Sequence, residues 1–195
     1  MKLVFATNNL HKLKEIRAAV NSSVKIAGLN EIGISEEIPE TALTLEGNAI
    51  QKVNYIYNKL RIPCFADDTG LEVEALNNRP GIFSARYAGE ECIAENNVNK
   101  LLSEMLGELN RKARFRTVIA FMHKDQVHCF EGIIQGIITY EKRGENGFGY
   151  DPVFLPEGSE KTFAQMSLIE KNKISHRSKA LQKFISFLNS KILSE

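Results

Sequence analysis

The first sixty residues alternate between a short apolar run and two helical patterns. Residues 3–6 form a β-rich run, and polar Thr7, Asn8 and Asn9 follow it. Apolar side chains then recur at the spacing of an amphipathic helix, at Leu10, Leu13, Ile16 and Val20. We expect the polar residues between run and helix to cap the helix. A second helix is predicted from about residue 44 to 60, ended by Pro63.

Two adjacent aspartates separate the next two predicted strands. A buried strand is expected over residues 62–66 and a half-buried strand over 71–76, with "DDTG" between them. Because successive strand residues point to opposite faces, Asp67 and Asp68 can serve one site only if the chain turns. Thr69 and Gly70 favour such a turn. We therefore expect one aspartate to face a site while the other caps or supports it.

The second half of the chain mixes helices with a predicted hairpin. The sequence "NNRPG" at 77–81 predicts a turn, and a third amphipathic helix is expected over 94–109, with Leu109 on its apolar face. Two β-rich runs, 115–122 and 127–140, are separated by four polar residues and predict a hairpin. "GENGFGYDP" at 144–152 is expected to be a loop. The last helix is expected over about 175–192, with Leu181, Phe184, Leu188 and Ile192 pointing inward. Strand–helix units combined with a hairpin predict one α/β domain with a mixed sheet over residues 1–195.

The net charge and the cysteine content restrict the kinds of ligand and the compartment that we expect, but they do not restrict the fold. Hydrophobic residues make up 43% and charged residues 25% of the chain, and the formal net charge is +1. No overall field recruits nucleic acid, so attraction for a charged ligand must be local. The three isolated cysteines argue against a disulfide framework or zinc site and favour a reducing compartment. With no signal peptide and no membrane span recognised, we expect a cytoplasmic protein that binds neither nucleic acid nor membrane.

Two predicted helices begin with positive charge, which is unfavourable at a helix N-terminus. His11 and Lys12 lie in the first turn of one, and His176 and Arg177 open the last. Each misplaced cation costs from a few tenths to about 1 kcal/mol. Two such helices suggest bound phosphate; the alternative is two solvated ends whose cations extend into water. The segment "TNNLHK" lacks the Walker A pattern, which disfavours a P-loop ATPase.

Acidic side chains form a candidate metal site. Asp67, Asp68 and Glu72 cluster in the sequence, and Glu40 lies before the second helix. Mg²⁺ is typically held by one or two carboxylates, with water and substrate phosphates as its other ligands. The second helix adds Asn48 and Lys52 at i and i+4, away from its apolar stripe. The alternative is that "DDTG" is only a turn stabilised by an Asx-type hydrogen bond.

A glycine-rich loop supplies aromatic side chains. In "GFGYDP", Phe148 and Tyr150 offer faces on which a nucleobase can stack. The same residues are also ordinary turn formers. Lys171, His176 and Arg177 follow downstream and are hydrogen-bond donors when charged.

Taken together, these motifs resemble the inosine/xanthosine triphosphate pyrophosphatase family, the Ham1-type non-canonical purine NTPases. The resemblance runs from residue 3 to about 188 and rests on "TNNLHK", Glu40-Thr41, Glu46-x-Asn48-Ala49-x-x-Lys52, "ADDTGLEVEAL", "PGIFSARYAG", "GFGYDPVF" and "EKNKISHRSKAL". It implies a Mg²⁺-dependent enzyme, usually a homodimer, that cleanses the nucleotide pool by hydrolysing ITP, dITP and XTP to the monophosphate and pyrophosphate. It also implies an elongated central mixed sheet flanked by helices, in two lobes with the nucleotide in the cleft between them.

The resemblance assigns site residues one by one. Glu40 and Asp68 resemble the metal carboxylates, and Asp68 also the catalytic proton acceptor. The residues that resemble substrate contacts are the triphosphate loop Thr7, Asn8, Asn9, Leu10, His11 and Lys12, the second phosphate contact Lys52, the substrate contact Thr69, and the base pocket Phe148, Gly149, Tyr150, Asp151, Lys171, His176 and Arg177. Asn8 stands where many relatives have glycine. Since asparagine tolerates the left-handed conformation, we expect the turn to be kept.

These assignments make chemical sense. Mg²⁺, Lys12 and Lys52 would neutralise charge developing on the phosphates while water attacks at the α-phosphorus. A carboxylate bound tightly to Mg²⁺ is a poor base, so we expect Asp68 to position the attacking water and Asp67 to support it. Cationic side chains such as Lys171 or Arg177 would donate a hydrogen bond to the 6-oxo group of hypoxanthine or xanthine. The 6-amino group of adenine is itself a donor and would face these donors without a hydrogen bond.

Two other functions are compatible with parts of the pattern. A nucleotide sensor could keep the pocket without catalysis, although it need not keep Glu40, Asp68, Lys12 and Lys52. A phosphatase would instead remove the γ-phosphate. Product analysis separates the three functions, because they yield pyrophosphate, no product or orthophosphate.

Overall fold

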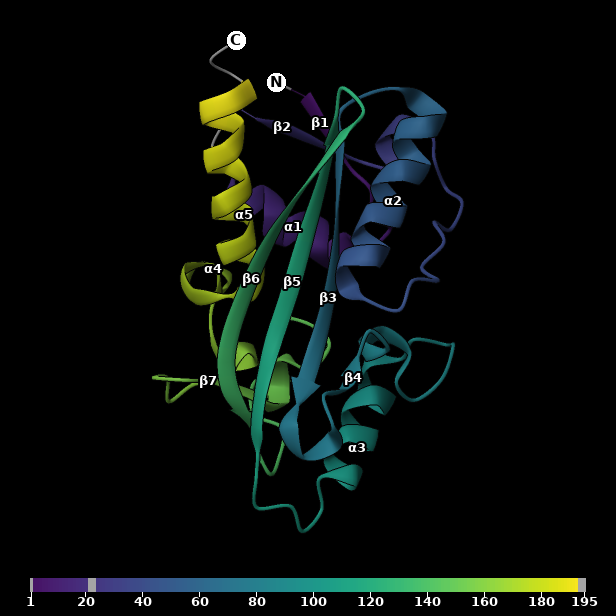
Figure 1. Cartoon of the computed structure of the whole chain (residues 1–195). Helices are drawn as coiled ribbons and strands as arrows, with labels where there is room; N and C mark the ends of the chain where they lie inside the picture. Colours follow the sequence, from purple (N-terminus) through teal and green to yellow (C-terminus); the bar gives the residue numbers. More distant parts are fainter. Residues whose placement is uncertain (1, 21–23, 193–195) are drawn as a thin grey trace. The chain divides into compact units, whose positions relative to one another are not determined.

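A mixed β-sheet is the framework of the protein in the computed structural model, which describes residues 2–20 and 24–192. Within these residues the sheet has seven strands in the order β2-β1-β3-β5-β6-β7, with β4 paired to β3 (Figure 1). Strand β1 pairs in parallel with β2 and with β3, whereas β4 and β7 pair antiparallel with β3 and β6. The strands are β1 (Lys2–Phe5), β2 (Lys25–Gly28), β3 (Cys64–Val73), β4 (Arg79–Gly81), β5 (Lys112–His123), β6 (Gln126–Ile138) and β7 (Phe154–Pro156). The predicted mixed α/β class is confirmed.

Five α-helices accompany the sheet in the described residues. They are α1 (Leu10–Ala19), α2 (Leu45–Leu60), α3 (Ala94–Glu104), α4 (Leu168–Ile174) and α5 (His176–Phe187). The predicted first cap is confirmed, because the side chain of Asn9 accepts a hydrogen bond from the backbone N–H of Lys12 at the start of α1. The side chain of Thr44 caps α2 in the same way. No helix in the described part of the chain is long and apolar enough to span a membrane.

The chain divides into two compact units, each assembled from separate segments. Unit 1 comprises Met1–Asp68, Thr117–Gly132 and Arg177–Glu195, and unit 2 comprises Thr69–Arg116 and Ile133–His176. Strands β3, β5 and β6 contribute residues to both units. The interpretation of residues 1–195 as one domain stays a prediction.

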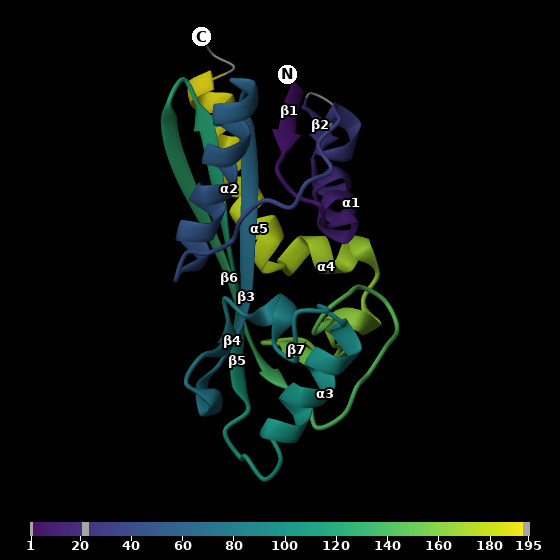
Figure 2. The same ribbon diagram turned by 90° about the vertical axis from the view of Figure 1, so that its right-hand side faces the viewer.

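In unit 1, strand β3 has helices on both of its faces. Phe65 stacks on Phe5 and contacts Phe184 of α5, and it belongs to the cluster of buried side chains that includes Leu13 of α1. The thiol of the preceding residue, Cys64, instead reaches the carbonyl of Val53 in α2. In Figure 2, α1 and α2 lie on either side of β3. The alternation of the strand therefore separates residues that face α1 and α5 from residues that face α2.

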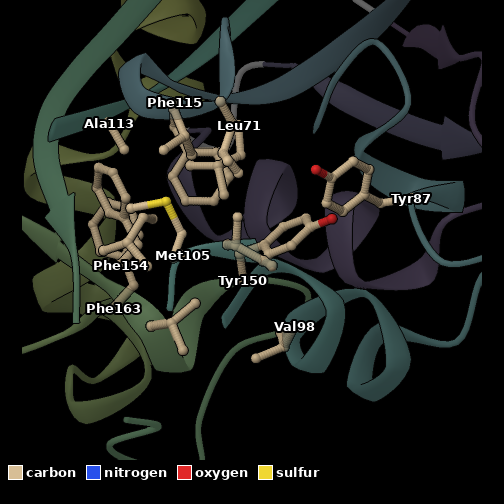
Figure 3. Close-up of a cluster of buried hydrophobic side chains, with 14 of the residues drawn as sticks. Leu71, Tyr87, Val98, Met105, Ala113, Phe115, Tyr150, Phe154 and Phe163 are labelled. Carbon is tan, nitrogen blue, oxygen red and sulfur yellow. The ribbon is translucent and has the colours of Figure 1, made fainter. Parts of the chain in front are cut away.

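Unit 2 has its own aromatic core. Phe115, Phe154 and Phe163 pack against one another, with ring centroids 4.7 to 6.1 Å apart. Figure 3 shows these rings around Met105, with Tyr150 and Tyr87 beside each other at another part of the cluster. Tyr150 is 4% exposed, and its hydroxyl donates to the carbonyl oxygen of Ser84.

The predicted turn within "DDTG" is wrong. Residues 64–73 form one continuous strand, so the buried and half-buried strands expected here are a single element that ends at Val73. Gly70 has another purpose: a Cβ at this position would lie 2.6 Å from the carbonyl oxygen of Gly81 in β4. The glycine permits the close approach of β4 rather than a turn. The turn expected at 77–81 is confined to Asn77 and Asn78, both with positive φ.

Other differences concern the ends of elements. Helix α3 stops at Glu104, and Leu109, predicted to point inward, is 90% exposed. The predicted last helix is confirmed as α5 with Leu181, Phe184 and Leu188 buried, but a separate helix α4 precedes it. The side chain of Ile192 lies outside the described residues. The hairpin β5–β6 is confirmed, and its turn residues Lys124 and Asp125 both have positive φ, as a two-residue hairpin turn favours.

Candidate functional site

Asp67 faces α1 and α5 and is buried among cations. Its Oδ1 lies 3.0 Å from Nζ of Lys12, and Nε of Arg177 donates to its Oδ2 at 3.2 Å. Nη1 of Arg177 in turn donates to Glu15 of α1. Asp67 is 1% and Arg177 3% exposed. The two cations that are unfavourable at helix starts therefore converge on one buried carboxylate.

The charges of this group are mutually stabilised. Burial alone would raise the pKa of Asp67, but Lys12 and Arg177 outweigh it and hold that pKa well below its usual range. For Arg177, burial would lower the pKa, and Glu15 and Asp67 outweigh it and raise that pKa. Asp67 is thus held in its ionised form near neutral pH by the two cations.

Asp68 faces α2 and has a different set of partners. Nδ2 of Asn48 donates to its Oδ2 at 3.1 Å, and Nζ of Lys52 lies 3.3 Å from its Oδ1. The same Nζ donates to Oε1 of Glu40 at 2.7 Å and to the backbone oxygen of Asp67 at 2.7 Å. One lysine therefore holds both candidate metal carboxylates.

The surroundings of Asp68 favour a protonated carboxyl group, whereas the surroundings of Asp67 favour a carboxylate. Burial raises the pKa of Asp68, and attraction by Lys52 and Lys12 only partly offsets this. For Lys52, burial would lower the pKa, but Asp68 and Glu40 outweigh it and raise that pKa. Two adjacent aspartates consequently differ in chemistry because they lie on different faces of β3.

Glu40 and Asp68 fit a Mg²⁺ ion. Both supply hard carboxylate oxygens, and both already contact the positive Nζ of Lys52. No group of three or more His, Cys, Asp or Glu that could hold a metal occurs among the described residues. Two protein carboxylates are the usual number for Mg²⁺ bound together with phosphate and water.

The predicted triphosphate loop lies at the carboxyl end of β1, and its Lys12 contacts Asp67. It follows β1, which is parallel to β3, and the N–H of Ala6 donates to the carbonyl of Phe65 at 2.7 Å. Oγ1 of Thr7 accepts from the N–H of Asn9 at 3.1 Å, and Nδ2 of Asn8 donates to the carbonyl of Glu36 at 3.1 Å. Asn8 does not have positive φ, so it does not adopt the left-handed conformation. Leu10 is 68% exposed and His11 is also exposed, both in the first turn of α1.

The predicted base pocket residues of unit 2 form a second group around Asp151. Its Oδ2 accepts from Nζ of Lys171 at 2.6 Å and from the N–H of Phe148 at 2.9 Å. Nζ of Lys171 lies 5.0 Å from the ring centroid of Phe148 and 5.3 Å from that of Phe163. Gly147 is required here, because a Cβ would lie 2.0 Å from Oδ2 of Asp151. Asp151 thereby joins the ammonium group of Lys171 in α4 to the backbone of the glycine-rich loop.

The remaining predicted residues fall into both units. Thr69 begins unit 2, and His176 stacks on Phe115 with ring centroids 4.6 Å apart. Arg177, expected in the base pocket, lies with the carboxylates of unit 1. Sequence reasoning missed Glu15 and Phe163 as members of these groups. Glu15 could have been found, since it follows Lys12 by three residues and so shares its helix face.

Comparisons with known proteins identify the family and the fold. The sequence model of the Ham1 family matches residues 3–187. The chain is 53% identical over 190 residues to the dITP/XTP pyrophosphatase of Flavobacterium psychrophilum, covering 97% of this chain and 100% of that protein. It is 55% identical over 188 residues to the dITP/XTP pyrophosphatase of Porphyromonas gingivalis, covering 96% and 97%. Among solved structures, the Staphylococcus aureus Ham1 protein is similar with a TM-score of 0.88 and 39% identity, covering 98% of this chain and 100% of that one.

Proposed function

Because the chain belongs to the Ham1 family, we propose that it hydrolyses the non-canonical purine nucleoside triphosphates ITP, dITP and XTP to the monophosphate and pyrophosphate. The relatives named dITP/XTP pyrophosphatase support this substrate class. The observation that carries the proposal is that the two adjacent aspartates of β3 have different partners. Asp67 is held ionised by Lys12 and Arg177, whereas Asp68 shares Lys52 with Glu40.

Glu40 and Asp68 would hold Mg²⁺. When bound, the ion supplies positive charge that neutralises phosphate oxygens and orients the substrate. Lys12 and Lys52 bind the triphosphate, since an ammonium group held by carboxylates can also contact a phosphate oxygen. Thr7, Asn8, Asn9, Leu10 and His11 complete the loop around it.

Asp68 orients the attacking water. Nδ2 of Asn48 donates to its carboxylate and Nζ of Lys52 lies 3.3 Å from it, so the carboxylate is held in a fixed orientation. Asp67 stays ionised and fixes Lys12 at the start of α1. Asp68 therefore acts on the attacking water, and Asp67 holds the phosphate-binding Lys12.

The residues around Asp151 read the purine. Phe148 offers a ring for stacking, and Lys171 is a buried donor suited to a 6-oxo group. The amino group of adenine would face a donor there, which a buried site disfavours strongly. Gly149 and Tyr150 shape the loop, and Thr69 and His176 are the other substrate contacts proposed in unit 2, whereas Arg177 holds Asp67 in unit 1.

Product analysis tests the proposal directly. Purified protein is incubated with ITP, dITP, XTP, ATP or GTP at several Mg²⁺ concentrations, and pyrophosphate and orthophosphate are measured separately. We expect stoichiometric pyrophosphate from the first three nucleotides and much lower kcat/KM for ATP and GTP. Orthophosphate as the main product would indicate a phosphatase, and binding without product would indicate a sensor.

The family resemblance also leads us to propose a cytoplasmic homodimer. Light scattering coupled to size-exclusion chromatography tests the oligomeric state, and a mass of 21.9 kDa would mean a monomer.

A further inference from the structure

The irregular segment that carries Glu40 is bound along one face of α2. Asn48, Gln51, Lys52, Tyr55 and Lys59 follow one another at intervals of one, three or four residues, which places them on one side of the helix. The adjacent face carries the buried apolar residues Leu45, Ala49, Val53 and Ile56. We call residues 36–42 the Glu40 segment and these five polar residues the α2 stripe.

Contacts pair the segment with the stripe in reverse order. Oδ1 of Asn48 accepts from the N–H of Ala42 at 2.9 Å. Oε1 of Gln51 accepts from the N–H of Thr41 at 2.9 Å, and its Nε2 donates to Oγ1 of Thr41 at 2.9 Å.

The pairing continues beyond the centre of the segment. Nζ of Lys52 donates to Glu40, and Tyr55 and Lys59 both donate to Oε1 of Glu36. The Glu40 segment therefore runs antiparallel to α2, with side-chain contacts at both of its ends.

The dimensions of the two elements agree with this pairing. From Asn48 to Lys59 a helix advances by about 16 Å. Six residues of extended chain, from Glu36 to Ala42, span at most about 20 Å. The segment can thus follow the stripe nearly fully extended, which leaves it little slack.

Gln51 differs from its neighbours in a useful way. Asn48 and Lys52 also contact Asp68, so their substitution changes the proposed metal site itself. Among the described residues, the side chain of Gln51 hydrogen-bonds with both of its polar atoms to Thr41, the residue next to Glu40. It has no hydrogen bond to the carboxylate of Glu40 or of Asp68 within residues 2–20 and 24–192.

We propose that Gln51 is a positioning residue that holds Glu40 in place for the metal ion. This inference rests on the proposed function, because it assumes that Glu40 is a metal ligand. Partners that orient a metal ligand typically contribute about ten- to a hundredfold to metal affinity. Gln51 acts through the backbone of Thr41, so we expect the lower end of that range.

The test compares Gln51→Ala with Asn58→Ala, a change at an exposed position of the same helix. Alanine is the best helix former, so neither variant weakens α2. Binding of Mn²⁺ alone is measured by electron paramagnetic resonance, without nucleotide or turnover. We expect about tenfold weaker Mn²⁺ binding in Gln51→Ala. Wild-type affinity is expected in Asn58→Ala.

Two further measurements distinguish positioning from general damage. Amide hydrogen exchange of Thr41 should accelerate in Gln51→Ala, because its N–H loses its acceptor. In ITP hydrolysis, the Mg²⁺ concentration for half-maximal rate should rise about tenfold. The kcat at saturating Mg²⁺ should stay within about twofold of wild type, since Gln51 touches no reacting group.

Unchanged Mn²⁺ affinity in Gln51→Ala would overturn the inference, as would a loss of kcat that Mg²⁺ does not restore. The proposed function is judged separately, from the wild-type protein. If wild type releases pyrophosphate from ITP while Gln51→Ala behaves normally, only the inference fails. If wild type binds no Mn²⁺ in the absence of nucleotide, the inference fails, whereas the proposed function is still decided by the products formed from ITP.

Discussion

Asp67 and Asp68 are adjacent in β3 but contact different helices. Asp67 pairs with Lys12 of α1 and Arg177 of α5, whereas Asp68 contacts Asn48 and Lys52 of α2. The strand continues through both residues, so its alternation assigns one carboxylate to each face. The two acids should therefore respond to substitution in different ways.

Asp68→Asn should lose activity more than stability. Removing a general base or water-positioning carboxylate typically lowers turnover by about 10² to 10⁴. Pyrophosphate release from ITP at saturating Mg²⁺ measures this. Asp125→Asn, in the exposed hairpin turn, is the matched control and should retain full turnover. Near-normal kcat in Asp68→Asn would refute the assigned role.

Asp67→Asn should lose stability. The substitution removes the negative charge shared by buried Arg177 and Lys12, and breaking a buried ion pair costs about 3–5 kcal/mol. Urea unfolding at pH 7 measures the free energy of unfolding. Asp125→Asn should change it by less than about 0.5 kcal/mol, because its partner Arg61 is exposed. Equal stability of both variants would contradict the structural role of Asp67.

The stability deficit of Asp67→Asn should depend on pH. Neighbouring cations lower the pKa of Asp67 in the folded protein below its unfolded value of about 3.9. Its contribution is therefore fully present above that value and is lost as the pH falls through the folded pKa. The difference in unfolding free energy between wild type and Asp67→Asn should be constant from pH 7 to about 5 and shrink below about 4. A difference that widens on acidification would contradict this sign.

Lys171→Gln should relax base selectivity. Glutamine can still donate to Asp151, so the loop is kept, but the cationic donor proposed for the 6-oxo group is lost. A hydrogen bond to a charged group contributes about 1.5–3 kcal/mol, so the ratio of kcat/KM for ITP over ATP should fall by about tenfold or more. An unchanged ratio with a reduced rate for both nucleotides would assign Lys171 to structure alone. Lys142→Gln, at an exposed ion pair, serves as the control.

Thiol labelling should separate the three cysteines. Cys64 is buried against α2, and burial raises the pKa of its thiol to about 12, so almost no thiolate exists near neutral pH. Cys92 and Cys129 are exposed. Mass spectrometry after iodoacetamide treatment should find two modified cysteines in the native protein and three after unfolding. Modification of Cys64 without unfolding would contradict its burial.

The sequence predicted elements where local pattern and tertiary packing agree. Helix α2 begins at the cap residue Thr44, where its apolar periodicity also begins. The hairpin β5–β6 turns at Lys124 and Asp125, between the two β-rich runs. At Thr69 and Gly70 the local preference for a turn was overridden by pairing with β4, a contact that periodicity cannot reveal. Leu109 was misplaced because α3 ends at Glu104, five residues short of the apolar pattern.

The sequence indicated which charged residues belong to the candidate site, but not which of them contact one another. The unfavourable cations at two helix starts suggested bound phosphate, which stays a prediction; Lys12 and Arg177 contact the carboxylate of Asp67. For Arg177 the neighbouring negative charge is supplied by Glu15 and Asp67, which are 162 and 110 residues away in the chain. Such distances carry no local signal, so only the fold could identify these partners.

The contact between Glu15 and Arg177 also concerns the order in which the protein is made. Domains begin to fold from the N-terminus during synthesis, at about 5–20 residues per second. The guanidinium that balances Glu15 and Asp67 belongs to α5, which follows every strand of the described sheet. A nascent chain that has not yet reached α5 contains both carboxylates without this cation. Completion of the ionic core around Asp67 must therefore wait for nearly the whole chain, and a chain truncated before α5 cannot reach the same folded state.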